Sequence, residues 1–80
     1  MSSTRYLFDA QDINDALVKA TVKEVAAILK ERGYNPVKQL AGYLMSGDPG
    51  YISNYKDARN KILKVDRAQI LEILVKEHLK

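Results

Sequence analysis

The sequence predicts an all-α protein, built as a compact bundle of four helices plus a short helical turn. Apolar residues recur at the spacing of helices in four segments, and no run alternates apolar and polar residues like a strand. Asn-Pro and Asp-Pro pairs, at 35–36 and 48–49, each combine a favoured helix cap with a favoured first helical residue. The 80 residues suffice for one domain. We therefore expect a flexible tail over residues 1–11 and a single helical domain over residues 12–80.

The first predicted helix covers residues 13–32. Asp12 can cap its start, and Gly33 suits a left-handed residue just after its end. Six apolar side chains share an arc about 140° wide on this helix, namely Leu17, Val18, Val22, Val25, Ile28 and Leu29. This stripe predicts one face buried against the rest of the domain.

The second predicted helix covers residues 36–46 and ends at Gly47. Gly42 lies in its middle, where glycine costs about 1 kcal/mol relative to alanine. We therefore expect the backbone of another segment to approach Gly42 closely. The Asp48-Pro49 pair then predicts a single helical turn over residues 49–52.

Two more helices are predicted over residues 54–65 and 67–79. Asp66 and Gln69 have the spacing of a capping box at the start of the last helix. Apolar residues cover about 240° of this last helix, so it needs partners on two sides. A short chain without disulfides also commonly gains stability by oligomerisation. We expect a homodimer, whose interface candidates are Ile70, Leu71, Leu74 and Val75.

Composition argues against several classes of protein. The chain has no cysteine and one histidine, so we expect no disulfide, no metal site and no cofactor. A Ser-His-Asp type of enzyme is disfavoured, and His78 near the C-terminus is interpreted as structural. No apolar run reaches the roughly 18–20 residues of a membrane span, and no signal peptide is visible. These features predict a cytoplasmic protein.

The net charge of +3 lies in residues 49–80, which carry seven basic and four acidic side chains. If one helix continues through Lys56, Arg59, Lys64 and Arg67, these four share one face opposite the apolar residues. This face is either simply solvated or binds an anion. Arg59, Lys64 and Arg67 are therefore candidates for docking a phosphate or an acidic partner. A small basic helical nucleic-acid-binding protein remains the alternative.

Four motifs together resemble the IreB family, also called ReoM. They occur in the family's order and without insertion: Gly33-Tyr34-Asn35-Pro36, Gln39-Leu40-Ala41-Gly42-Tyr43, Ser46-Gly47-Asp48-Pro49 and Asp57-Ala58-Arg59. The resemblance covers residues 31–79 and, more loosely, the first helix. It implies a small cytoplasmic helical homodimer that regulates other proteins and has no enzymatic activity. It also implies no small-molecule substrate, no nucleic acid partner and no membrane insertion.

The resemblance further implies a regulatory phosphoprotein of cell-wall synthesis. Such proteins are substrates of a membrane Ser/Thr kinase with PASTA repeats and of its cognate phosphatase. Unphosphorylated, they promote Clp-dependent degradation of the UDP-N-acetylglucosamine 1-carboxyvinyltransferase, and phosphorylation of an N-terminal threonine relieves this effect. They thereby negatively regulate peptidoglycan synthesis and cephalosporin tolerance. Carried over to this chain, Thr4 is the acceptor candidate, and Arg59 and Arg67 match basic positions of the family.

Overall fold

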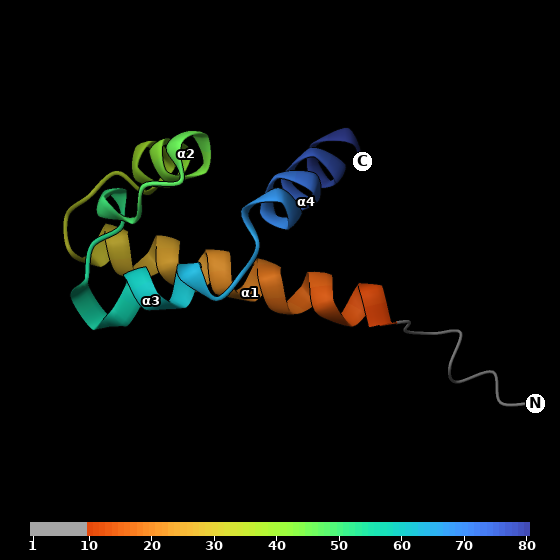
Figure 1. Ribbon diagram of the computed structural model, residues 1–80, viewed down its shortest axis with the longest axis horizontal. Helices are drawn as coiled ribbons and strands as arrows, with labels where there is room; N and C mark the ends of the chain where they lie inside the picture. Colours follow the sequence, from red (N-terminus) through yellow and green to blue (C-terminus); the bar gives the residue numbers. More distant parts are fainter. Residues whose placement is uncertain (1–9) are drawn as a thin grey trace, which may run out of the picture.

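The computed structural model describes residues 10–80 (Figure 1). Thr4 and most of the predicted tail lie outside the described residues. The described part consists of helices joined by short turns, without a strand, which confirms the all-α prediction. Its elements in chain order are α1 (Ala10–Glu31), α2 (Pro36–Ser46), η2 (Pro49–Tyr51), η3 (Tyr55–Asp57), α3 (Ala58–Leu63) and α4 (Arg67–Leu79). Among these helices, none is both long enough and apolar enough to cross a membrane.

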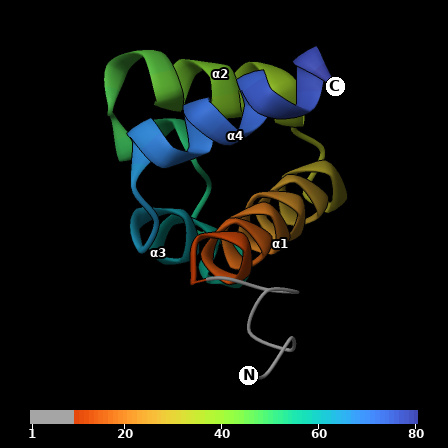
Figure 2. The same cartoon turned by 90° about the vertical axis from the view of Figure 1, so that its right-hand side faces the viewer.

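Helix α1 is the element on which the other three α-helices pack. Figures 1 and 2 show α2 and α4 crossing the same side of α1, while α3 runs beside it. The core combines side chains from all four α-helices and the turn after η2: Val18, Val25, Ile28, Leu29, Tyr43, Ile52, Ala58, Ile62, Ile70 and Ile73. Leu17 of the predicted stripe is instead 63% exposed.

Helix α1 begins at Ala10, three residues before the predicted start. Asp12 therefore lies in the first turn, where its negative charge still favours the helix N-terminus, and not at the cap. The other end agrees with the prediction, because Gly33 is left-handed with φ +96°. The amides of Gly33 and Tyr34 donate to the carbonyls of Lys30 and Leu29, which is a Schellman motif.

Helix α2 has the predicted bounds because local residues define both ends. The Asn35 Oδ1 accepts a hydrogen bond from the Lys38 amide at 3.1 Å, and Pro36 occupies the first helical position. At the other end, Gly47 is left-handed with φ +75°, and its amide donates to Tyr43 O at 2.7 Å. These bonds satisfy backbone groups that every helix end leaves without a partner.

The expectation of a close backbone approach to Gly42 is wrong: the ring of Tyr51 covers it instead. A Cβ atom added at Gly42 would lie 2.4 Å from Tyr51 Cε1. The Gln39 Nε2 donates to Tyr51 O at 2.9 Å, so the same helix face also fixes the backbone of this turn. The missing side chain thus makes room for an aromatic ring.

This contact predicts that Gly42→Ala has different effects on stability in two backgrounds. In the Tyr51→Ala background, Gly42→Ala is expected to stabilise the protein by about 1 kcal/mol, the helix propensity difference. In the wild-type background the added methyl displaces the Tyr51 ring, and this gain is lost or reversed. Urea denaturation of the four proteins measures the coupling. Equal effects of Gly42→Ala in both backgrounds would contradict the contact.

The single helix predicted over residues 54–65 is wrong. Lys56 (φ 49°) and Asp57 (φ 65°) are both left-handed, and α3 comprises only Ala58–Leu63. Left-handed backbone costs an L-residue roughly 1–2 kcal/mol. Two local contacts accompany the break: the Asn60 Nδ2 donates to Asp57 Oδ1 at 2.7 Å, and Lys56 Nζ lies 5.5 Å from the centre of the Tyr55 ring.

Helix α4 has the predicted bounds, but the predicted capping box is wrong. Asp66 occupies the N-cap position, yet its side chain makes no capping hydrogen bond. The Gln69 Nε2 lies 3.4 Å from Asp15 Oδ1 on α1. The tertiary contact with α1 therefore replaces the local one.

Candidate functional site

Arg59, a predicted docking residue, is bonded to the turn after α2. Its Nε donates to the carbonyl oxygens of Pro49 at 3.2 Å and Ile52 at 3.0 Å. The turn also caps itself, since Asp48 Oδ1 accepts from the Gly50 amide at 2.8 Å. Arg59 thus connects α3 to η2. Its Nη1 and Nη2 groups take no part in these two hydrogen bonds.

Arg67 holds the same turn from the other side. Its Nη1 donates to Leu44 O at 2.9 Å, one of the carbonyls left without a partner at the end of α2. Its guanidinium also lies against Gly47, where an added Cβ would be 2.8 Å from Arg67 Cζ. The Gly47-Asp48-Pro49 motif is therefore enclosed by the two arginines that the sequence singled out.

The continuous basic face predicted for residues 56–67 does not form. The break at Lys56 separates it from Arg59, Lys64 follows the end of α3, and Arg67 begins α4. The nucleic-acid interpretation depended on this single helix face. Lys64 is exposed, whereas Arg59 and Arg67 are half-buried and bonded to backbone carbonyls.

The remaining residues of the family motifs build the fold. Gly33, Asn35 and Pro36 end one helix and begin the next, as described above. Tyr43 is buried in the core, whereas Tyr34 is half-exposed beside the turn. These motifs thus specify the connections around α2.

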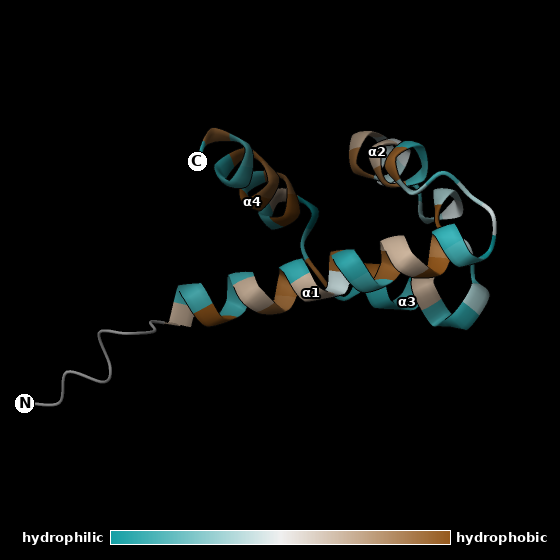
Figure 3. Cartoon of the chain, turned by 180° about the vertical axis from the view of Figure 1, so that it is seen from behind, coloured by the Kyte–Doolittle hydropathy of each residue, from teal (hydrophilic) through white to brown (hydrophobic). Residues whose placement is uncertain are grey.

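The apolar face of α4 is only partly covered. Figure 3 shows apolar segments recurring along this helix between polar ones. Ile70 and Ile73 are buried in the core of the chain itself, so Ile70 is not available for a second chain. Leu71, Leu74 and Val75 are 44%, 46% and 56% exposed.

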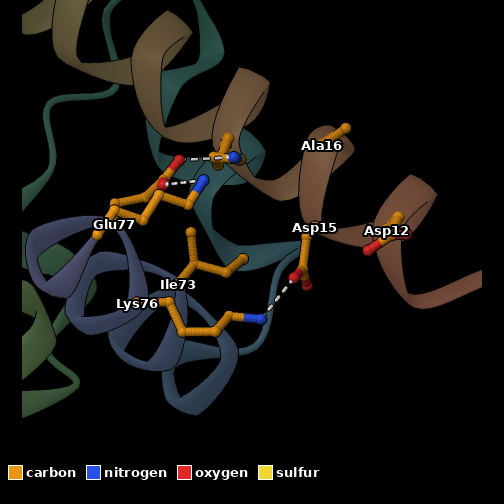
Figure 4. Close-up of a pocket in the computed structure, with 8 residues that line it drawn as sticks. Asp12, Asp15, Ala16, Ile73, Lys76 and Glu77 are labelled. Atoms are coloured by element: carbon orange, nitrogen blue, oxygen red, sulfur yellow. Dashed lines mark hydrogen bonds and ion pairs between the residues drawn. The ribbon is translucent and has the colours of Figure 1, made fainter.

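Helices α1 and α4 also face each other across a charged cleft of about 340 Å³ (Figure 4). Its lining comprises Asp12, Asp15, Ala16, Lys19, Ile73, Lys76, Glu77 and Lys80. Two ion pairs cross it: Lys76 Nζ to Asp15 Oδ2 at 2.9 Å, and Lys19 Nζ to Glu77 Oε1 at 2.6 Å. This cluster leaves no local pattern in the sequence, because its partners lie about sixty positions apart along the chain.

Glu77 and Asp15, two of the carboxylates that line this cleft, have lowered pKa values. The hydrogen bond from Lys19, and next that from Lys80, lower the pKa of Glu77 from 4.5 to about 2. The hydrogen bond from Lys76 likewise lowers the pKa of Asp15, and Asp15 in turn raises the pKa of Lys76. Both side chains of the Lys19–Glu77 pair are exposed to solvent, so salt screens this pair. Asp15 is only 14% exposed, so its pair with Lys76 is screened less.

These shifts predict a loss of stability in acid. Because the folded state lowers the pKa of Glu77, its contribution is present above pH 4.5 and is lost as pH falls toward 2. A Glu77→Gln variant should therefore lose less of its thermal midpoint over that range than the wild type. Glu72→Gln on the same helix is the control and should follow the wild type. Parallel curves for all three proteins would contradict the assignment.

The chain matches the family described as IreB regulatory phosphoprotein over residues 3–80. The match includes all four α-helices, the two arginines around Gly47-Asp48-Pro49, and Thr4 in the N-terminal segment. The resemblance noted from the four motifs is thereby confirmed. The chain belongs to the IreB family of regulatory phosphoproteins.

Proposed function

We propose that this chain is a non-enzymatic regulator that is switched by phosphorylation of Thr4. Membership in a family of regulatory phosphoproteins carries this proposal, and Thr4 lies within the matched residues. The kinase is a membrane Ser/Thr kinase with PASTA repeats, and a cognate phosphatase opposes it. A phosphate adds about −1.5 to −2 charges, enough to change which surface an N-terminal segment contacts.

The regulated process in this proposal is peptidoglycan synthesis. The unphosphorylated protein promotes Clp-dependent degradation of the UDP-N-acetylglucosamine 1-carboxyvinyltransferase, and phosphorylation at Thr4 relieves this effect. It thereby acts as a negative regulator of wall synthesis and of cephalosporin tolerance. The protein works through contacts with other proteins in the cytoplasm and needs no cofactor or small-molecule substrate.

Arg59, Lys64 and Arg67 are the proposed docking positions for the phosphate or for an acidic partner. Three geometric facts support them: Lys64 is exposed, and each arginine has N–H groups beyond those bonded to backbone carbonyls. Guanidinium groups bind phosphate in a bidentate manner. Arg59 and Arg67 also donate hydrogen bonds to backbone carbonyls at and after the end of α2. An anion that binds these arginines would therefore change the hydrogen bonding of that turn.

The proposed assembly is a homodimer formed through the exposed face of α4. Leu71 and Val75 lie on the side of this helix away from the core, and Leu74 lies at its edge. Sedimentation velocity at micromolar concentration should show a dimer that Val75→Asp dissociates. Leu17→Asp, on an exposed part of α1, should leave it intact. A wild-type monomer would contradict the assembly.

The switch is tested by incubating the protein with a PASTA-type kinase and ATP and mapping phosphate by mass spectrometry. We expect phosphate on Thr4 and none on the Thr4→Ala variant. In cells, Thr4→Ala should lower the level of the carboxyvinyltransferase, because its degradation is no longer relieved. Absence of phosphate from Thr4 and from the neighbouring Ser2 and Ser3 would refute the switch.

A further inference from the structure

Two neighbouring left-handed residues come shortly before Arg59. Among residues 10–80 they are the non-glycine residues with positive φ: Lys56 at φ 49°, ψ 32°, and Asp57 at φ 65°, ψ 22°. We call them the left-handed pair. Ala58, which follows them, is already right-handed at φ −58°. Left-handed backbone is unfavourable for a residue with a Cβ atom, so the surrounding structure has to hold this pair in place.

Side chains of α1 and α3 contact the left-handed pair. The Lys56 Nζ donates to both carboxylate oxygens of Glu31, the last residue of α1, at 2.9 Å each. The Asp57 Oδ1 accepts a hydrogen bond from Asn60 Nδ2 on α3 at 2.7 Å. The pair is thus bonded to α1 through Lys56 and to α3 through Asp57.

Buried residues fix the chain on both sides of the pair. Ile52 and Ala58 are fully buried, so the segment between them connects two fixed points of the core. A continuous helix over residues 54–57 would add about one turn to α3 and change the path of the chain from Ile52. The left-handed pair therefore sets the direction in which the chain enters α3.

The hydrogen bonds of Arg59 depend on this direction. Its Nε donates to Pro49 O at 3.2 Å and to Ile52 O at 3.0 Å, and both carbonyls lie before the pair along the chain. A change of the pair to right-handed helical backbone would alter each φ by more than about 100°. Arg59 would then move relative to the two carbonyls, and its Nε would lose these bonds.

We propose that Lys56 and Asp57 are positioning residues, whose left-handed backbone holds Arg59 against the turn after α2 and so orients its Nη1 and Nη2 groups toward an anion. The orientation toward an anion rests on the proposed function, in which Arg59 docks a phosphate or an acidic partner. The hold on Arg59 does not rest on it. With Nε bonded to two carbonyls, the guanidinium loses less freedom when an anion binds to its other N–H groups.

Two matched double variants of the full chain test the hold on Arg59. Lys56→Gly with Asp57→Gly, and Lys56→Ala with Asp57→Ala, remove the same side chains and the same contacts. Glycine accepts left-handed backbone, whereas alanine favours a continuous helix. The two variants therefore differ in the backbone conformation that they prefer.

The first measurement is the exchange with water of the Arg59 Nε–H proton, followed by NMR. We expect slow exchange in the wild type and in the glycine double variant, and loss of this protection in the alanine double variant. The Cα chemical shifts of residues 56 and 57 should be helical only in the alanine double variant. If that variant does not fold, Asp57→Ala and Asp57→Gly repeat the comparison with a single residue.

The second measurement is the affinity for a synthetic peptide of residues 1–9 that carries phosphate on Thr4. The glycine double variant should bind it within about twofold of the wild type, because Arg59 stays in place. The alanine double variant should bind it at least roughly fivefold more weakly. Both variants lack the Lys56 charge, so loss of that charge cannot cause the difference.

The two measurements separate the positioning role from the proposed function. Equal protection of the Arg59 Nε–H in the two double variants would overturn the positioning role. Different protection with equal peptide affinity would overturn the orientation toward an anion. A peptide that does not bind the wild type would contradict the phosphate docking of the proposed function, while the exchange measurement would still decide whether the left-handed pair holds Arg59.

Discussion

Replacing Gly47 by alanine is expected to destabilise the protein by about 2–5 kcal/mol. Two effects add at this position. The left-handed backbone, with φ +75°, costs an L-residue about 1–2 kcal/mol. The new Cβ would also lie 2.8 Å from Arg67 Cζ, so the guanidinium must move and its hydrogen bond to Leu44 O is lost, which costs about 1–3 kcal/mol.

Gly33 supplies the matched control for this substitution. It is also left-handed, with φ +96°, but no atom lies within 4 Å of the position that its Cβ would occupy. Gly33→Ala should therefore cost only the backbone part, about 1–2 kcal/mol. Urea denaturation measures both losses. In an Arg67→Ala background the Gly47→Ala loss should fall to the Gly33→Ala value; a loss that stays the same would show that Arg67 does not cause it.

Replacing Leu29 by alanine is expected to cost a similar amount, about 2–5 kcal/mol. Leu29 is fully buried at the centre of the core, so the change removes apolar contacts and leaves a cavity. A folded chain of 80 residues has a total stability of only about 4–12 kcal/mol. The loss is therefore a large fraction of the total stability, and the thermal midpoint should fall clearly.

Leu17→Ala on the same helix makes the identical chemical change where the side chain is 63% exposed. It should alter the free energy of unfolding by no more than about 0.5 kcal/mol. Thermal and urea unfolding, followed by circular dichroism, compare the two variants. Comparable losses at the two positions would contradict the placement of the core on one side of α1.

The bounds of α2 and α4 could be predicted from the sequence. The residues that end α2 are close to one another along the chain, and the apolar pattern of α4 runs from its start to its end without a break. Asn35 and Pro36 start α2, and Gly47 stops it, through bonds that span at most four residues. The break before α3 has no such signal. Lys56 and Asp57 are neither glycine nor proline, and their left-handed backbone follows from how the whole turn packs.

The candidate site was predictable in its residues but not in their partners. Arg59 and Arg67 stand out by charge, yet their bonds go to carbonyls seven to 23 residues away. The Asp66–Gln69 spacing fits a capping box, but the Gln69 Nε2 donates its hydrogen bond to Asp15 Oδ1 on α1 instead. Tertiary packing determines these hydrogen-bond partners, and a pattern of residues close in sequence does not contain that information.

The charged cleft between α1 and α4 has a consequence for chain connectivity. Asp12 and Lys80 line the same hollow, so the two ends of the described chain lie on the same side of the molecule (Figure 1). A circular permutant could therefore join the original ends by a linker, to which residues 1–9 would add length, and open the chain between α3 and α4 instead. In that molecule α4 would come first in synthesis and α3 last, while the packing around α1 would be unchanged. The order of the helices along the chain is thus separable from their arrangement in the fold.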